Sequence, residues 1–366
     1  MPPERVPARA VVQAADQLRR VMLNELKNFA RKSKRLTIAY RISENWLERM
    51  RFASGKIVYS DGPAIHRHTT AESSVAWIRR HFEDYLHYSG LSVQHLKDGR
   101  ILEIGHGDNY GVALLFLAYG ARHVTCIDKY YSIRDPEREL AIYALLRKDL
   151  DRPLRQRFDH AISLEGGIQC NPEKLTAIYG VRLEEADKQL RPSSFDLIIS
   201  RAVLQYLMFD RAFAVMDELL APQGYMIHRI DLRDMGMFSR GDLHPLTFLT
   251  IPDPIYRWMR SDSPQANRSR ISDYREKMKG LDYSTKILIT RVLGREEELL
   301  PHAEQLRLGR DYTEESLQLL EAIRPKLLRQ FRDLPDEDLL VTGICLVAQK
   351  GFQTYAASTH SNPLSL

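Results

Sequence analysis

The N-terminal part of the chain repeats its apolar positions with a helical period. Within residues 9–52 apolar side chains recur three and four positions apart, as at Leu18, Met22, Leu26 and Phe29. Residues at that spacing share one face of an α-helix, so the pattern predicts an amphipathic helical appendage. The apolar spacing that follows predicts another helix, which ends near Gly90.

From residue 100 onward, short apolar runs alternate with helical segments. Apolar runs bounded by turn residues are typical of buried strands, and strands that alternate with helices form a mostly parallel, doubly wound sheet of the α/β class. The last two strands are separated by a helical stretch, a pattern that suits a closing antiparallel strand at one sheet edge. The expected strands occupy residues 100–105, 123–128, 194–200, 224–230, 284–292 and 339–350, and the first helix residues 112–120.

Length and composition indicate one main globular domain with additions. A chain of 366 residues with 44% hydrophobic residues can bury a large core. We expect a basic helical segment at 1–72, acting as a lid or a dimer contact. A core domain should follow at 73–352, with a substrate-binding insertion at 231–280 and a flexible tail at 353–366.

The positive charge is concentrated at the N-terminus. Residues 1–60 hold 13 Lys and Arg against 5 Asp and Glu, whereas the whole chain has a formal net charge of +5. Such a segment could follow phosphates, but its basic cluster at 31–35 has no RNA-binding motif beside it. A solvated helix face or a homodimer contact is therefore favoured over nucleic acid.

Several protein classes are disfavoured by composition. The longest apolar run, residues 110–121, is shorter than the roughly 18 residues that a membrane span needs. Charges near the start interrupt any secretory signal, so we expect a cytoplasmic protein. Cys126, Cys170 and Cys345 are widely spaced, which predicts free thiols rather than disulfides or a zinc site.

The turn after the first expected strand has the composition of a ligand site. Gly105 and Gly107 lie where the backbone of an open parallel sheet comes closest to a ligand, and Gly111 permits close packing as the helix begins. Asp128 ends the next strand, where a carboxylate can accept hydrogen bonds from both ribose hydroxyls. The ligand is therefore predicted to be a nucleoside.

Two nucleoside classes compete for this turn. A dinucleotide site uses G-x-G-x-x-G, whereas the spacing here is G-x-G-x-x-x-G. Glu103 and Asp108 also place negative charge where a pyrophosphate would be repelled. S-adenosylmethionine carries a sulfonium and an ammonium, which favour nearby carboxylates.

The chain resembles class I S-adenosylmethionine-dependent methyltransferases in the segments "LEIGHGDNYG", "VTCID", "SFDLIISRAVLQYL" and "LLAPQGYMIH". The resemblance implies a Rossmann-like, seven-stranded sheet and S-adenosyl-L-methionine as cofactor. It also implies that the methionine part lies in the glycine turn, the ribose on the acid that ends the second strand, and the adenine near an acid before "FDL". The implied cofactor residues are Glu103, Gly105, Gly107, Asp108, Asn109, Asp128, Glu184, Glu185, Ser200 and Arg201.

Less specific segments are similar to those of small-molecule and glycan methyltransferases from bacterial biosynthetic clusters. They are "IDLRDMGMFS", "HPLTFL" and "NRSRISDY". The last segment offers Asn267, Arg268, Arg270 and Tyr274 to an acidic or hydroxylated acceptor. The alternative is a solvated turn, and for the two arginines exposure at the surface is expected.

Candidate catalytic residues follow the fourth and fifth expected strands. His228 is the first choice as general base, although strand alternation also allows a core histidine. Tyr206 could orient the acceptor or lie near the sulfonium, and it stands, with Gln205, where relatives frequently have Glu-His. Asp231 and His244 complete the set, and their mixed spacing makes a metal site improbable.

The leading hypothesis is methyl transfer to oxygen or nitrogen of a small polar natural-product, amino-acid-like or glycan acceptor. An NAD(P)-dependent oxidoreductase is one alternative, opposed by the glycine spacing and the acids around it. A module that binds S-adenosylmethionine without turnover is another, which the missing Glu-His pair allows.

Overall fold

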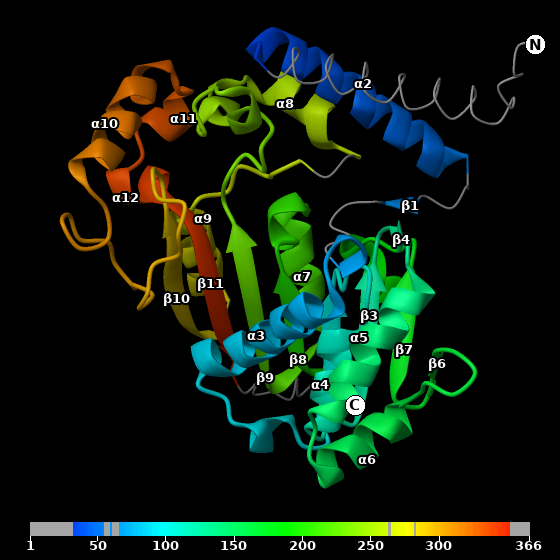
Figure 1. Ribbon diagram of the computed structural model, residues 1–366. Helices are drawn as coiled ribbons and strands as arrows, with labels where there is room; N and C mark the ends of the chain where they lie inside the picture. The colour runs from blue at the N-terminus through cyan, green and yellow to red at the C-terminus, as the bar shows by residue number, and fades with distance from the viewer. Residues whose placement is uncertain (1–31, 55–58, 61–65, 263–264, 282, 352–366) are drawn as a thin grey trace, which may run out of the picture.

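The computed structural model describes residues 32–54, 59–60, 66–262, 265–281 and 283–351. Its centre is a seven-stranded sheet with the order β10-β11-β9-β8-β2-β3-β7, whose strands are spread across Figure 1 from β10 on the left to β7 on the right. In this order the strands β9, β8, β2, β3 and β7 are parallel to one another, and β11 runs antiparallel to both of its neighbours, β9 and β10. The strands are β2 Arg100–Ile104, β3 His123–Asp128, β7 Leu175–Tyr179, β8 Phe195–Arg201, β9 Leu220–Asp231, β10 Tyr283–Val292 and β11 Val341–Lys350. The expected α/β class and the mostly parallel sheet are confirmed.

The position of the antiparallel strand corrects one expectation. β11 lies between β9 and β10 rather than at the sheet edge, so that Leu346 pairs with His228 on one side and Ile287 on the other. Nine of its ten residues are buried, as a strand covered on both faces requires. β10 begins with exposed polar residues and forms the edge.

Helices cover both faces of the sheet and give two hydrophobic clusters. One face is covered by α3 Ala71–Ser89, α4 Gly111–Ala118, α5 Pro136–Lys148 and α6 Arg152–Ala161. The other is covered by α7 Phe209–Leu219, α9 Ile271–Lys279, α10 Glu314–Ile323 and the short helices α11 Arg329–Arg332 and α12 Asp336–Leu340. Strand alternation decides which face each residue joins: Ile101, Leu197 and Ile227 belong to the first cluster, and Leu102, Ile198 and Met226 to the second.

Local sequence explains the helix ends that lead to the site. The helix α3 begins after Thr70, whose side chain accepts a hydrogen bond from Ser73 N, and ends at Gly90 with φ 71°, as a left-handed C-terminal glycine does. All eight residues of α4 are buried, because this helix lies between the sheet and its neighbours and is apolar all round.

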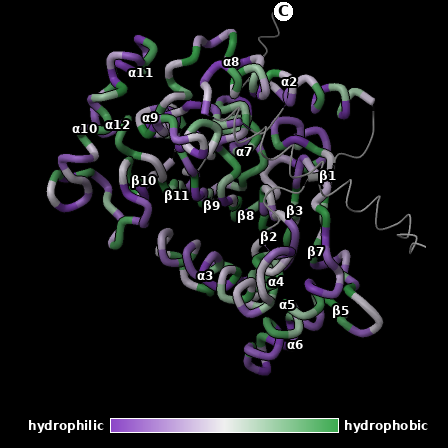
Figure 2. Tube along the Cα trace, turned by 45° about the horizontal axis from the view of Figure 1, so that its top comes forward, coloured by the Kyte–Doolittle hydropathy of each residue, from purple (hydrophilic) through white to green (hydrophobic). Residues whose placement is uncertain are grey.

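A further layer lies beyond the carboxyl ends of the parallel strands. There α2 Lys34–Ala53 packs on α8 Asp253–Arg260, as Figure 1 shows. Asn45 joins them, since its amide donates to Ser261 Oγ (2.9 Å) and accepts from Asp262 N (2.7 Å). Hydrophobic and hydrophilic residues alternate along α2 in Figure 2.

Two predicted segments fall wholly or partly outside the described residues. Most of the basic segment before α2 and the tail at 353–366 belong there, so their predicted roles stay predictions. Short pairs of strands complete the fold: β1 Tyr59–Ser60 with β4 Tyr131–Ser132, and β5 Ile162–Ser163 with β6 Gln169–Cys170. No helix among the described residues has the length and apolar character of a membrane span. Cys126, Cys170 and Cys345 are free thiols.

Candidate functional site

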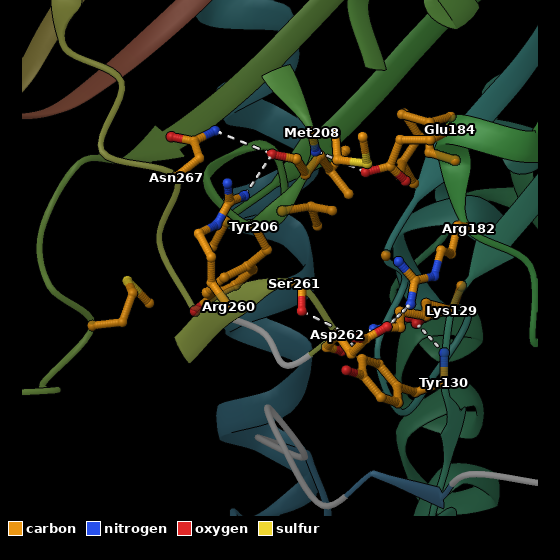
Figure 3. A pocket seen from close by; sticks show the side chains of 18 of the residues that line it. Lys129, Tyr130, Arg182, Glu184, Tyr206, Met208, Arg260, Ser261, Asp262 and Asn267 are labelled. Atoms are coloured by element: carbon orange, nitrogen blue, oxygen red, sulfur yellow. Dashed lines mark hydrogen bonds and ion pairs between the residues drawn. The ribbon is translucent and has the colours of Figure 1, made fainter. Parts of the chain in front are cut away.

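A cavity of about 920 Å³ opens at the carboxyl ends of the parallel strands. Its walls come from the turns after β2, β3, β7 and β8, and from α8 and the segment that follows it. Figure 3 shows Lys129, Tyr130 and Arg182 on one side and Tyr206, Arg260 and Asn267 on the other. This is the position where open α/β sheets bind ligands.

The two glycines of the first turn line this cavity for different reasons. Gly105 and Gly107 have φ 74° and 71°, a left-handed conformation that favours glycine. A Cβ on Gly105 would lie 2.4 Å from Val203 Cγ2, whereas one on Gly107 would meet nothing within 4 Å. Packing therefore restricts Gly105, and Gly107 leaves its backbone open to the cavity.

The first amides of α4 are already hydrogen bonded within the protein. Tyr110 N donates to Tyr143 Oη (2.8 Å), and Gly111 N donates to Asn109 Oδ1 (2.7 Å). Asn109 is buried and binds the Gly111 amide rather than lining the cavity. These two amides are therefore not available to a phosphate, which helix N-termini otherwise bind.

Asp128 reaches the cavity from the end of β3. Its Oδ1 accepts a hydrogen bond from Tyr130 N (2.9 Å). Burial raises the pKa of this carboxyl to about 6, and backbone hydrogen bonds from Tyr130 and Gly107 oppose part of that rise. The carboxylate is thus ionised at neutral pH and able to accept hydrogen bonds.

Glu103 and Asp108 do not line the cavity, which corrects the expectation that they present charge to the ligand. Glu103 is buried in β2 with Cys126 Sγ 3.7 Å from its Oε2, and burial raises its pKa to about 7. Asp108 is buried and accepts a hydrogen bond from Arg67 N (3.0 Å). Both carboxyls therefore contact protein groups, Glu103 from within β2 and Asp108 from the turn after it.

The remaining predicted cofactor residues divide in the same way. Glu184 lines the cavity and accepts from Met208 N (2.8 Å), while Glu185 is exposed and lies 3.8 Å from Lys188 Nζ. Arg201 lines it and pairs with Asp84 (2.7 Å). Ser200 is buried in β8, outside the lining.

His228 is a core residue, which corrects its assignment as general base. Its side chain is fully buried, Nδ1 lies 2.8 Å from Ser200 Oγ, and it does not line the cavity. Burial lowers its pKa to about 3, so the imidazole stays neutral. The cause is position, because β9 lies inside the sheet between β8 and β11, and helices cover both faces of that sheet.

Of the other predicted catalytic residues, only Tyr206 lines the cavity. Burial raises its pKa to about 12. Asp231 is held by Arg233, whose Nε lies 2.9 Å from its Oδ1. His244 holds the loop after β9 in place: its Nε2 lies 2.9 Å from Leu319 O, and its Nδ1 accepts a hydrogen bond from Leu246 N.

The segment "NRSRISDY" contributes differently from the sequence expectation. Asn267 and Arg268 line the cavity, whereas Arg270 and Tyr274 are fully buried. Arg270 donates to Leu232 O (2.5 Å), and burial lowers its pKa to about 10. The expected exposure of the two arginines is therefore wrong.

Several residues of the cavity were missed by sequence reasoning. Their signals were weak: Lys129 and Tyr130 directly follow Asp128, and α8 has its polar residues on one face. Ala202 and Met235, together with Arg268, which the sequence already offered to an acceptor, line the cavity with φ between 52° and 68°, and such strain in non-glycine residues gathers at functional sites. The other missed residues include Arg182, Tyr256, Arg257, Arg260 and Asp262.

No three His, Cys, Asp or Glu side chains of the described ranges come together as metal ligands. The lining side chains are those of an organic ligand site, with apolar residues and a few polar groups.

Neither protein-family models nor curated proteins match this chain. Among solved structures it is similar to phosphoethanolamine N-methyltransferase 2 of Haemonchus contortus with S-adenosyl-L-methionine, at 15% identity over 75% of this chain and 53% of that chain, with a TM-score of 0.37. It is also similar to an S-adenosylmethionine-dependent methyltransferase from Mesorhizobium loti, at 14% identity over 72% of this chain and 95% of that chain, with a TM-score of 0.34. The chain thus spans about half the length of the Haemonchus enzyme. With TM-scores this low, these similarities establish no function.

Proposed function

We propose that this chain is an S-adenosylmethionine-dependent methyltransferase acting on oxygen or nitrogen of a small polar acceptor. One observation carries the proposal: the open backbone of Gly107 and the carboxylate of Asp128 border the same cavity. They come from the ends of adjacent strands β2 and β3, where a nucleoside binds in sheets of this kind.

The nicotinamide alternative has less support. A dinucleotide fold has a parallel sheet with its pyrophosphate on the amides of the first helix. Here an antiparallel strand is inserted next to β9, and the amides of Tyr110 and Gly111 are already bonded to Tyr143 and Asn109.

The lining residues fit adenosine and methionine parts at different places. Asp128 would accept hydrogen bonds from ribose hydroxyls, with Tyr130, Leu183 and Glu184 around the base. The backbone of Gly105 and Gly107, with Arg201, would hold the methionine end. When bound, the cofactor supplies an electrophilic methyl group on sulfur.

The chain itself would contribute alignment rather than a strong base. No histidine of the described residues lines the cavity, and Tyr206 has a pKa of about 12, so its hydroxyl stays protonated at neutral pH. We assign Tyr206 to orient the acceptor by donating a hydrogen bond. Alignment of this kind can supply up to about 7–11 kcal/mol of a displacement barrier. The resemblance to enzymes of bacterial biosynthetic clusters adds natural products, amino-acid-like compounds and glycans as acceptors.

Calorimetric titration with S-adenosylhomocysteine and with NADH tests this function. We expect binding of the former alone, weakened by Asp128→Asn but unchanged by Asp333→Asn, which alters an exposed carboxylate. Binding of NADH alone would refute the proposal. A chain that binds S-adenosylhomocysteine, but forms none of it when incubated with S-adenosylmethionine and a library of acceptors, would be a binding module.

A further inference from the structure

One side of the cavity is rich in arginine. Beside the carboxylates of Asp128, Glu184, Asp253 and Asp262, the cavity is lined by Arg240, Arg257, Arg260 and Arg268. They come from α8 and from the segments after β9 and after α8. Arg260 lies beside Tyr206 and across the cavity from Lys129 and Tyr130, as Figure 3 shows.

Arg268 is already paired with the carboxylate of Asp253. Its guanidinium forms an ion pair with Asp253 and donates to Ile251 O (2.7 Å). It also lies over the Tyr256 ring, with Cζ 4.1 Å from the centroid. The charge of Asp253 is therefore balanced, and the other three arginines remain.

Arg260 forms no ion pair within the described residues. One guanidinium nitrogen donates to Leu207 O (3.1 Å), while Nε is buried with no hydrogen-bond partner among the described residues. Burial lowers the pKa of Arg260 and the nearby charge of Arg268 also lowers it, while Tyr256 and Glu184 oppose part of that change. Two like charges held near each other in a partly desolvated cavity are stabilised by an anion.

Arg257 and Arg240 complete the arrangement. Arg257 lies three residues before Arg260 on α8, a spacing that puts both side chains on one helix face. Arg240 packs over Gly236, where a Cβ would lie 2.5 Å from its Nε. Both are exposed and form no ion pair within the described residues.

We propose that the acceptor carries a carboxylate or phosphoryl group, bound by Arg260 together with Arg257 and Arg240. The inference rests on the proposed methyl transfer, because it assigns this side of the cavity to the acceptor. The anion would bind beyond Tyr206, and the nucleophilic atom would point toward Gly107 and Asp128. A planar guanidinium with free N–H groups suits either oxyanion.

Binding of inorganic phosphate and of acetate tests the site in two arms. Each is titrated into the full chain, with and without saturating S-adenosylhomocysteine, at an ionic strength held constant with sodium chloride. We expect at least one of them to bind, and Arg260→Gln to weaken that binding roughly tenfold or more, as loss of a charge-assisted hydrogen bond does. Tighter binding of phosphate indicates an acceptor with a phosphoryl group, and tighter binding of acetate indicates an acceptor with a carboxylate.

Two further variants distinguish loss of the anion site from misfolding and from a general loss of positive charge. Arg257→Gln alters an exposed side chain, so the variant should fold normally and should also bind the anion more weakly. Arg329→Gln removes the same charge from α11, where the side chain is 88% exposed, and should change nothing. Affinity for S-adenosylhomocysteine should be equal in all three variants.

The outcomes separate the two proposals. Binding of S-adenosylhomocysteine without binding of either anion would overturn the acidic acceptor and leave methyl transfer standing. Equal anion binding by wild type, Arg260→Gln and Arg257→Gln would overturn it too. Anion binding that depends on Arg260, in a chain that binds no S-adenosylhomocysteine, would refute methyl transfer and with it the acceptor role of the site.

Discussion

Asp262 and Arg182 form an ion pair of 2.9 Å that joins the segment after α8 to the segment after β7. Lys129 also donates to the Asp262 carbonyl oxygen (2.5 Å). All three residues line the cavity, and Figure 3 shows these contacts between its walls. The layer of α2 and α8 is thus tied to the ends of the strands beside Asp128.

Asp262→Asn should speed the dissociation of S-adenosylhomocysteine. The substitution removes the charge that Arg182 binds but keeps the backbone bonds to Lys129 and Asn45. A partly exposed ion pair contributes about 0.5–1 kcal/mol, so we expect dissociation roughly two- to fivefold faster in stopped-flow measurements. Asp333→Asn, on the exposed surface, serves as control. Equal rates in both variants would mean that this layer does not retain the ligand.

Cofactor affinity should depend on pH through Asp128. Its pKa is about 6, so above this pH the carboxylate accepts ribose hydrogen bonds, and as the pH falls through 6 it becomes protonated and affinity decreases. Asp128→Asn should bind more weakly by about 1–3 kcal/mol and show no such pH dependence.

Glu103→Gln separates the two buried carboxyls near the turn. Glu103 has a pKa of about 7 but does not line the cavity. The calorimetric pH profile of this variant should therefore keep its decline near pH 6. A flat profile in Glu103→Gln would transfer the titration from Asp128 to Glu103.

His228→Leu should affect stability and not chemistry. The substitution leaves Ser200 Oγ without its partner at 2.8 Å, which costs about 1–3 kcal/mol of unfolding free energy. Turnover per folded molecule should persist. Because the two residues form one buried contact, the double variant with Ser200→Ala should lose less than the two single losses added. Loss of turnover at unchanged stability would restore His228 as the base.

The sequence predicts the fold because one physical pattern controls it. Apolar runs such as "SFDLIIS" leave little choice but a buried strand, and their alternation with helices gives a doubly wound sheet. The same rule puts Gly107 and Asp128 at neighbouring strand ends. What it leaves open is lateral order, since the apolar residues of β11 show that both its faces are covered but not that it lies between β9 and β10.

Side-chain direction at the site was harder to predict. His228 and Asp231 lie on the same strand, yet neither lines the cavity, because His228 is buried in the core against Ser200 and Asp231 is bound by Arg233. Arg260 lies in a segment with no motif, and its position in the cavity depends on three-dimensional neighbours such as Leu207. A sequence gives residue types for such a site, but the packing of α8 against the strand ends decides which ones meet.

Gly107→Ala should lower the affinity for S-adenosylhomocysteine, whereas Gly111→Ala should lower the stability of the fold and leave that affinity unchanged. At Gly107 the left-handed φ of 71° costs an added Cβ about 1–2 kcal/mol, and nothing within 4 Å opposes it. The methyl group would enter the cavity instead, so affinity for S-adenosylhomocysteine should fall. At Gly111 the Cβ would lie 2.4 Å from Ile78 Cδ1, inside the contact of α4 with α3.

Overpacking at Gly111 costs about 1–3 kcal/mol of unfolding free energy, offset in part by the better helix propensity of alanine. Affinity per folded molecule should remain, because Gly111 does not line the cavity. Denaturant unfolding and calorimetry on both variants measure the two quantities separately. If Gly107→Ala bound S-adenosylhomocysteine as tightly as wild type, the backbone at this turn would not contact the ligand, and the nucleoside would have to bind elsewhere in the cavity.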